Sequence, residues 1–187
     1  MSENIFFDTT KLKNCGANVI IGKTVRIRYP ELVEIGDNVI IDDFTYISTA
    51  LTIQNNVHIA AGCKLIGGSG ALVKIGEFST LAPNVVLAAG SDDYVAGLAS
   101  PIIPLEYKGS VDIGNIEIGR HCIVGANSTI LPNVRLFDGA AVGAQSLVKE
   151  NIPEWMLYGG IPSQFIRSRN RDEILRLERL WRLRNNA

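Results

Sequence analysis

Residues 118–148 read IGRHCIVGANSTILPNVRLFDGAAVGAQSLV, and an aliphatic residue returns at every sixth position of this stretch. These positions hold Ile118, Val124, Ile130, Leu136, Val142 and Val148. A period of six fits neither the turn of an α-helix nor the simple alternation of a strand. A short fixed repeat indicates stacked units that bury their apolar sides against one another, as in a hexapeptide β-helix.

The same period runs through much of the preceding chain, and each unit has a consistent internal pattern. Earlier aliphatic positions are Ile35, Ile41, Ile47, Ile53, Ile59, Leu65, Ile75, Leu81 and Leu87. The residue two places before each is often small or β-branched, and the residue three places after is often Asn or Gly. Because Asn and Gly tolerate left-handed backbone, each unit is predicted to be a short strand followed by a corner. Three units would make one coil of an all-β triangular prism.

The period is interrupted at three places: Ile27 to Ile35, Leu65 to Ile75 and Leu87 to Ile118. When the units are counted in threes, all three interruptions fall at the same corner of the triangle, where an insertion breaks no strand ladder. Ile113 could instead be an extra unit that shifts this count. The longest interruption predicts a loop over residues 90–114, and loops of this length in compact domains are usually functional.

The count also assigns outward side chains to faces. One face, the apolar face, carries Ile20, Ile40, His58, Thr80, Ile123 and Ala141. Another, the charged face, carries Glu34, Thr52, Lys74, Glu117 and Arg135. We expect the apolar face to be a subunit interface and the charged face to be solvated.

Length and composition exclude several classes of protein. The 187 residues suit one domain, and a net charge of −1 gives no case for nucleic acid or an anionic membrane. No apolar run reaches about 18 residues, and the first seven residues do not resemble a secretory signal, so we expect a cytoplasmic protein without a membrane span. Three cysteines argue against a disulfide framework and are predicted to be core residues.

The pattern divides the chain into an N-terminal segment (1–14), a β-helix (15–152) with its long loop, and a C-terminal extension with a helix (153–187). Asn170 and Glu173 are predicted to form a helix N-cap and capping box. Ile174, Leu177 and Trp181 then follow at helical spacing, so one side of this helix should pack on a prism.

Several motifs resemble those of a known family. They are Ile118-Gly119, Val124-Gly125-Ala126, Ile130-Leu131-Pro132, Val142-Gly143-Ala144, Ile152-Pro153 and Gly160-Ile161-Pro162. This series resembles the closing coils of the left-handed β-helix (hexapeptide-repeat) acyltransferases, in particular the galactoside, maltose and xenobiotic O-acetyltransferases. Residues 91–94 and 155–167 are similar to the acetyltransferases of surface-polysaccharide synthesis.

The resemblance implies a left-handed β-helix and a homotrimer with active sites between neighbouring prisms. It implies acetyl-CoA as co-substrate, held along the closing coils, and no metal. Ala126 and Ala144 would line the pantetheine arm, and Arg167 would meet a CoA phosphate. Lys149 is a further cofactor candidate, although it stands one position before the lysine usual in the family. Simple corner packing would also explain the two alanines.

Acyl transfer needs a base that takes a proton from the nucleophile, and histidine is the usual one. The chain has only His58 and His121, and the long loop, where galactoside-type enzymes carry their histidine, has none. We predict His121 as the base, with a corner residue in left-handed backbone as the alternative. We predict that Asp93 orients the base and that Asp92, Tyr94 and His58 bind substrate.

The sequence therefore predicts an acetyl-CoA-dependent acetyltransferase that acts on a hydroxyl or amino group of a nucleotide-linked or surface-polysaccharide sugar, by direct attack on the thioester. A non-catalytic scaffold is one alternative. An amino-sugar N-acetyltransferase of the sialic-acid and bacillosamine type is another, although Thr80 stands where those enzymes have a histidine. A γ-type carbonic anhydrase needs three zinc-binding histidines, and the chain has two.

Overall fold

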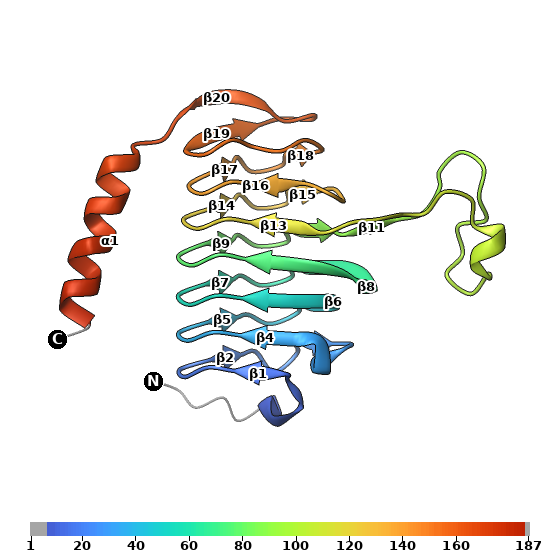
Figure 1. The fold of residues 1–187 in the computed structure, drawn as a ribbon, viewed down its shortest axis with the longest axis horizontal. Coiled ribbons are helices and arrows are strands. Elements are labelled where there is room, and N and C mark those ends of the chain that lie inside the picture. Colours follow the sequence, from blue (N-terminus) through green and yellow to red (C-terminus); the bar gives the residue numbers. More distant parts are fainter. Residues whose placement is uncertain (1–6, 186–187) are drawn as a thin grey trace.

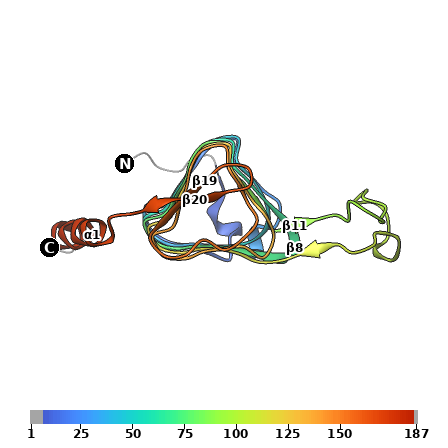
Figure 2. The same ribbon diagram turned by 90° about the horizontal axis from the view of Figure 1, so that it is seen from above.

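The computed structural model describes residues 7–185, which wind into a triangular parallel β-helix followed by one α-helix (Figures 1 and 2). The apolar face consists of β2 (Ile20–Ile21), β5 (Ile40–Ile41), β7 (His58–Ile59), β9 (Thr80–Leu81), β14 (Ile123–Val124), β17 (Ala141–Val142) and β19 (Met156–Gly159). The charged face contains β1 (Asn14–Cys15), β4 (Val33–Ile35), β13 (Ile116–Ile118) and β16 (Arg135–Leu136). The remaining face contains β3 (Arg26–Ile27), β10 (Val86–Ala88), β15 (Thr129–Ile130) and β18 (Leu147–Val148).

The aliphatic positions of successive coils lie directly above one another, as the period predicts. On the apolar face, Ile21 pairs with Ile41, and the register continues through Ile59, Leu81, Val124 and Val142. These side chains are buried and belong to the single core that fills the prism. The outward residues of the apolar and charged faces also pair as predicted, with His58 between Ile40 and Thr80. Cys63 and Cys122 are buried in the core and Cys15 is half-buried.

The corners adopt the left-handed backbone that the Asn and Gly pattern predicts. Positive φ angles occur at Asn38, Asn56, Asn84, Asn127 and Asn133, and also at bulkier residues such as Phe78, His121 and Trp155. Gly139 takes one of these places with a φ of +73°. A Cβ there would meet the Trp155 ring at 2.3 Å, so the glycine lets this ring lie against the corner.

All three interruptions do fall at one corner, between the remaining face and the charged face. Two long strands, β6 (Tyr46–Ile53) and β8 (Lys64–Ile75), run across it without a break. The short η2 helix (Pro30–Leu32) fills the interruption before β4. The longest interruption projects from this corner on an antiparallel stalk of β11 (Gly90–Ser91) and β12 (Asp112–Ile113) (Figure 1). Ile113 is half-exposed in this stalk, so it is not an extra unit of the prism.

The C-terminal part closes the prism and then leaves it. β19 pairs in parallel with β17, so the sheet continues past Pro153, and β20 (Gln164–Ser168) folds back antiparallel on β19. The α1 helix (Arg171–Asn185) then lies at the side away from the long loop (Figure 2). Asn170 Oδ1 accepts the Glu173 N–H at 3.2 Å, which confirms the N-cap, whereas the Glu173 carboxylate pairs with Arg176 instead of completing a capping box.

Short 3₁₀ turns occur near the N-terminus, at η1 (Thr9–Lys11), and within the loop, at η3 (Leu105–Tyr107). Across residues 7–185, no helix is long and apolar enough to span a membrane.

Candidate active site

His121 lies in a stack of side chains along the corner between the charged and apolar faces, which we name the helix corner. The corner residues of successive coils are Asn18, Asn38, Asn56, Phe78, His121, Gly139 and Trp155. The Phe78 and His121 rings are stacked with centroids 5.2 Å apart, and Trp155 lies 6.0 Å from His121 on the other side. This placement follows from the period, because each corner residue comes three places after an aliphatic position.

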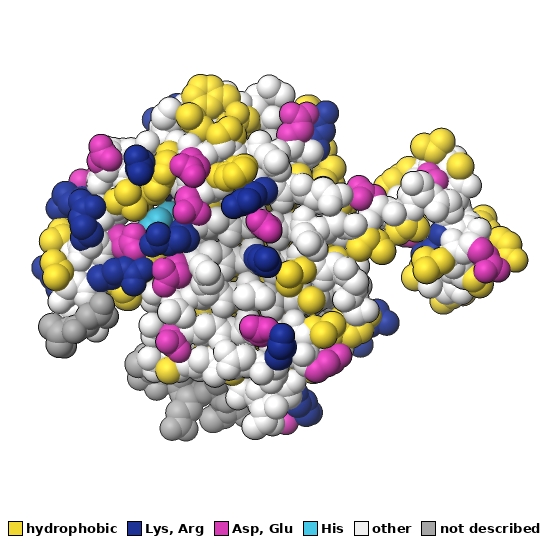
Figure 3. All heavy atoms as spheres, viewed as in Figure 1, with side chains coloured by type: hydrophobic (Ala, Val, Ile, Leu, Met, Phe, Trp, Pro, Cys, Tyr) yellow, Lys and Arg dark blue, Asp and Glu magenta, His cyan; other side chains and the backbone are white. Residues whose placement is uncertain are grey.

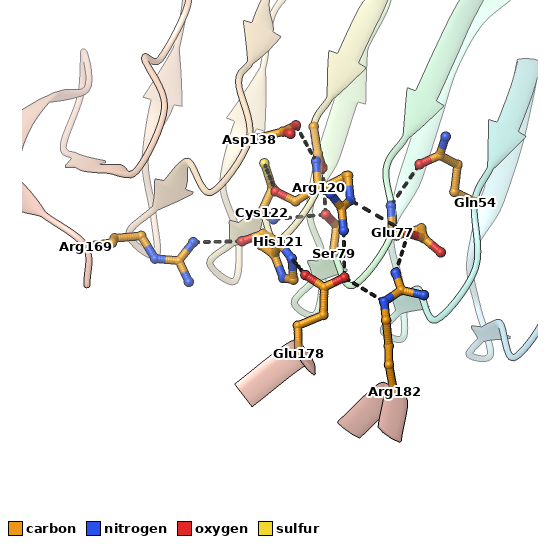
Figure 4. Close-up of polar contacts among 11 residues, drawn as sticks. Gln54, Glu77, Ser79, Arg120, His121, Cys122, Asp138, Arg169, Glu178 and Arg182 are labelled. Atoms are coloured by element: carbon orange, nitrogen blue, oxygen red, sulfur yellow. Dashed lines mark hydrogen bonds and ion pairs between the residues drawn. The ribbon is translucent and has the colours of Figure 1, made fainter. Parts of the chain in front are cut away.

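The α1 helix covers His121 and binds it. The histidine is only 7% exposed, and its Nε2 lies 2.8 Å from Glu178 Oε2 (Figure 4). Its backbone carbonyl accepts a hydrogen bond from the Arg169 guanidinium at 2.7 Å. A buried imidazole held by a carboxylate has a fixed ring orientation, as in many histidine sites of enzymes. The same contacts also make His121 an attachment point for the helix.

Glu178 is the centre of an ion-pair network that joins α1 to the prism. Its Oε1 accepts from Arg120 at 2.7 Å and from Arg182 at 2.8 Å (Figure 4). Arg182 also reaches Glu77 at 2.9 Å and lies over the Phe78 ring. Burial alone would raise the pKa of Glu178, but hydrogen bonds from Arg182 and His121 and the charge of Arg120 outweigh it and lower that pKa.

A groove of about 480 Å³ runs between α1 and the apolar face, and we call it the helix groove. It is lined by Asn38, Asn56, Val57, His58, Phe78, His121, Ile174, Leu177, Glu178 and Trp181. Both histidines of the chain therefore reach one concave surface. His58 Nε2 lies 2.8 Å from Asp42 Oδ2, so each histidine has a carboxylate partner. Mostly apolar walls with a few polar groups are typical of ligand sites.

The candidate residues for coenzyme A lie in different places. Arg167 lines a second groove, of about 420 Å³, which shares Ile174 with the helix groove. Ala126 and Ala144 precede corner residues at the edge of the apolar face away from α1. Lys149 lines a separate small groove at the end of the prism and lies 3.8 Å from Glu150. The structure therefore brings only Arg167 close to the helix groove.

The acidic residues of the long loop lie on the opposite side of the prism from α1 (Figure 2). Asp93 accepts backbone N–H groups of Val95, Ala96 and Ser110, all within the loop. These bonds, with that of Ser110 first, lower the pKa of Asp93. Tyr94 is almost fully exposed. One chain therefore does not bring Asp93 to His121, although the sequence analysis paired them.

Sequence reasoning missed the carboxylate partners of the two histidines. Glu178 is the residue four places after Ile174 and three before Trp181, so it lies on the packed stripe of the predicted helix. An acid within an apolar stripe was the available signal. Asp42 has no comparable signal, because it follows an aliphatic position as many solvated residues do.

Among residues 7–185, no three His, Cys, Asp or Glu side chains come together as a group that could hold a metal ion. The cysteines are poor nucleophiles, because burial raises the pKa of Cys63 to about 11 and that of Cys122 to about 12. Burial raises the pKa of Cys15 as well.

Comparisons with known proteins decide the family, although no protein-family model matches the chain. The chain is 33% identical over 175 residues to the dTDP-4-amino-4,6-dideoxy-D-glucose acyltransferase of Escherichia coli, over 91% of this chain and 88% of that protein. This chain belongs to the hexapeptide-repeat sugar acyltransferases. It is also 28% identical over 137 residues to the galactoside O-acetyltransferase of Escherichia coli K12, over 73% of this chain and 64% of that protein.

The structure of this acyltransferase is similar to that of AntD, an N-acyltransferase from Bacillus cereus in complex with dTDP and 3-hydroxybutyryl-CoA. The TM-score is 0.92 with 36% identity, over 99% of this chain and 100% of that one. A variant of AntD in complex with dTDP-4-amino-4,6-dideoxyglucose and coenzyme A gives a TM-score of 0.89. The fold is the left-handed parallel β-helix that the resemblance implied.

The network around Glu178 predicts a pH-dependent stability. A carboxyl whose pKa is lowered on folding stabilises the protein above its unfolded pKa, and this contribution is lost as the pH falls through the folded value. We expect Glu178→Gln to lower the melting temperature at pH 7, and its difference from the wild type to shrink below about pH 4.5. Thermal melts followed by circular dichroism between these pH values measure both quantities.

Glu173→Gln is the matched control, since it removes an exposed pair with Arg176 on the same helix and should barely change the melting temperature. A pH-independent effect of Glu178→Gln, or none at pH 7, would contradict the assignment of Glu178 as the attachment of α1.

Proposed function

We propose that this acyltransferase transfers an acyl group from coenzyme A to the amino group of a nucleotide-linked deoxy sugar. The observation that carries this proposal is similarity over nearly the whole chain to two proteins that are named for, or are bound to, dTDP-4-amino-4,6-dideoxyglucose. The matched range includes both the long loop and the C-terminal helix, since it covers 99% of the chain in the case of AntD. The galactoside enzyme matches a smaller part.

The proposed reaction is direct attack of the amine nitrogen on the thioester carbonyl carbon. The new C–N bond forms, the C–S bond breaks, and a proton from the amine ends on the thiol of coenzyme A. Backbone N–H groups would stabilise the tetrahedral oxyanion. The raised pKa values of Cys63 and Cys122 support this route over an acyl-cysteine intermediate. Acetyl-CoA is the donor predicted from the sequence, and Arg167, Lys149, Ala126 and Ala144 are the proposed contacts with it.

We propose a homotrimer in which the loop of one chain completes the helix groove of the next. The acids of the loop and the two histidines lie on opposite sides of one prism, so a site that uses both needs two copies. Exposed apolar side chains on both surfaces support this arrangement: Ile40 and Ile123 on the apolar face, and Tyr94, Val95 and Ile102 on the loop. Figure 3 shows hydrophobic side chains exposed on the projecting loop. Such exposed patches commonly mark interfaces.

His121 is the proposed general base, and the pair with Glu178 would orient its ring for proton transfer. Because His121 is buried under α1, it also contributes to stability. A test must therefore separate its role in proton transfer from its role in attaching the helix. His58 lines the same groove and is more exposed, which suits the proposed role in substrate binding.

The proposed reaction is tested by its product. We expect the purified protein to release free coenzyme A thiol from acetyl-CoA when dTDP-4-amino-4,6-dideoxyglucose is present, and to form a product that survives mild alkali because it is an amide. Thiol titration and mass spectrometry measure the two. A product that alkali hydrolyses would identify an ester and a hydroxyl acceptor, and the absence of any turnover would favour a scaffold.

The role of His121 is tested with His121→Gln, whose amide can still hydrogen-bond Glu178. We expect turnover to fall about 10²–10⁴-fold with little change in melting temperature, since the base is lost and the attachment of α1 is kept. His58→Gln, at the other histidine of the groove, should mainly raise the KM of the acceptor. Near-normal turnover of His121→Gln would leave His121 with its structural role alone.

A further inference from the structure

Arg169 lies between β20 and α1 and joins three coils of the prism. Its guanidinium Nη1 donates to the carbonyl oxygen of His121 at 2.7 Å (Figure 4) and to that of Gly139 at 2.6 Å. Its backbone N–H donates to the carbonyl oxygen of Trp155 at 2.7 Å. These three acceptors are the last three residues of the helix corner, so one residue of the C-terminal extension contacts three successive coils.

The backbone ladder does not use the carbonyl groups of these corner residues. The N–H of His121 donates to the carbonyl of Glu77, the residue before the corner in the preceding coil. The N–H of Gly139 likewise donates to the carbonyl of Arg120 and not to that of His121. Among the described residues, only Arg169 donates to the carbonyls of the last three corner residues. Arg169 therefore adds a connection between these coils that the repeat itself does not supply.

Stability alone is a weak reason for a cation at this place. Arg120 and Arg182 both pair with the Glu178 carboxylate, whereas no carboxylate within residues 7–185 pairs with Arg169. Arg169 is half-buried, and this burial lowers the pKa of its guanidinium. Because a charge that leaves water without an opposite charge costs free energy, the contacts of Arg169 suggest a role beyond holding the chain together.

His121 is held at both of its ends by the C-terminal extension. Its ring lies between Phe78 and Trp155, and its Nε2 contacts Glu178 at 2.8 Å. Its backbone is held through the carbonyl that accepts from Arg169. Glu178 therefore sets the rotation of the ring, and Arg169 sets the position of the corner from which the ring projects.

We propose that Arg169 is a positioning residue for proton transfer, because it fixes the His121 corner against the next two coils and so holds the imidazole in place in the helix groove. This inference rests on the proposed function, since it needs His121 as the base. A small displacement of a catalytic group can cost a large part of the rate, while substrate binding is unchanged. Arg169 touches neither substrate in this account and acts only through His121.

The test measures kcat and the KM of each substrate, acetyl-CoA and dTDP-4-amino-4,6-dideoxyglucose, with the full-length protein. Arg169→Met removes the donors, whereas Arg169→Lys keeps a positive charge and three N–H donors. Arg176→Met is the matched control, because Arg176 forms an exposed pair with Glu173 on α1. Arg169→Met is also combined with His121→Gln, and melting temperatures are measured for every variant.

We expect Arg169→Met to lower kcat about ten- to hundredfold with both KM values unchanged, which is the loss typical of a misplaced catalytic group. Arg169→Lys should recover most of this loss, and Arg176→Met should behave as the wild type. In the His121→Gln background, Arg169→Met should lower turnover less than about twofold further, because the two residues act through one proton transfer. If Arg169→Met does not fold at the assay temperature, Arg169→Gln takes its place, since its shorter, neutral side chain cannot bridge the same two carbonyls.

An equal fold loss in the wild-type and His121→Gln backgrounds would overturn the proposal, because Arg169 would then not act through His121. A loss of kcat explained by the fraction of unfolded protein would also overturn it, as would a lysine variant no better than the methionine variant. Failure of the proposed base is a separate result: it appears as near-normal turnover of His121→Gln. An unchanged kcat of Arg169→Met beside an impaired His121→Gln would reject the role of Arg169 alone.

Discussion

The register between coils is the constraint on which the rest of this structure depends. Each inward aliphatic side chain must lie over the one below it, as Ile59 lies over Ile41, so that the core is filled and the backbone ladder continues. Added residues can therefore be accommodated only at a corner. The long loop takes one corner, and the C-terminal helix leaves the prism near another. The prism therefore keeps the acidic residues of the long loop apart from the histidines of the helix groove.

Three of the polar pairs in these two regions are accordingly local. His121 pairs with Glu178, His58 with Asp42, and Lys108 with Asp92. The α1 helix forms one wall of the helix groove, and its position is fixed because Glu178 pairs with Arg120 and Arg182 pairs with Glu77. A neighbouring copy that inserts its loop would add an acid to a groove that already holds two oriented histidines.

Much of the fold was predictable from the sequence, because the period of six fixes which residues share a face. It predicted the pairing of His58 with Ile40 and Thr80, the common corner of the three interruptions, and the left-handed backbone at residues such as Asn56. These features depend only on repetition, so a single sequence contains them.

The site was less predictable, because its contacts depend on the course of the long loop and the C-terminal helix, which lie outside the repeats. His121 is covered by Glu178, which lies 57 residues further along the chain on a helix whose direction the period does not determine. The roles of Asp92 and Asp93 depend on the internal folding of the loop, where Lys108 and Ser110 return to the stalk. The long loop and the helix groove lie at different corners of one prism, so the predicted pairing of Asp93 with a histidine would need a second copy.

The central claim, a site shared between copies, is tested most directly by mixing two impaired variants, Asp92→Asn and His121→Gln, under conditions in which subunits exchange and at an acceptor concentration at which each variant alone is nearly inactive. In randomly mixed trimers, about a quarter of the sites would combine an intact loop from one chain with an intact groove from the next. The account therefore predicts that the mixture recovers about a quarter of the wild-type turnover. A mixture that stays as inactive as its components would contradict it.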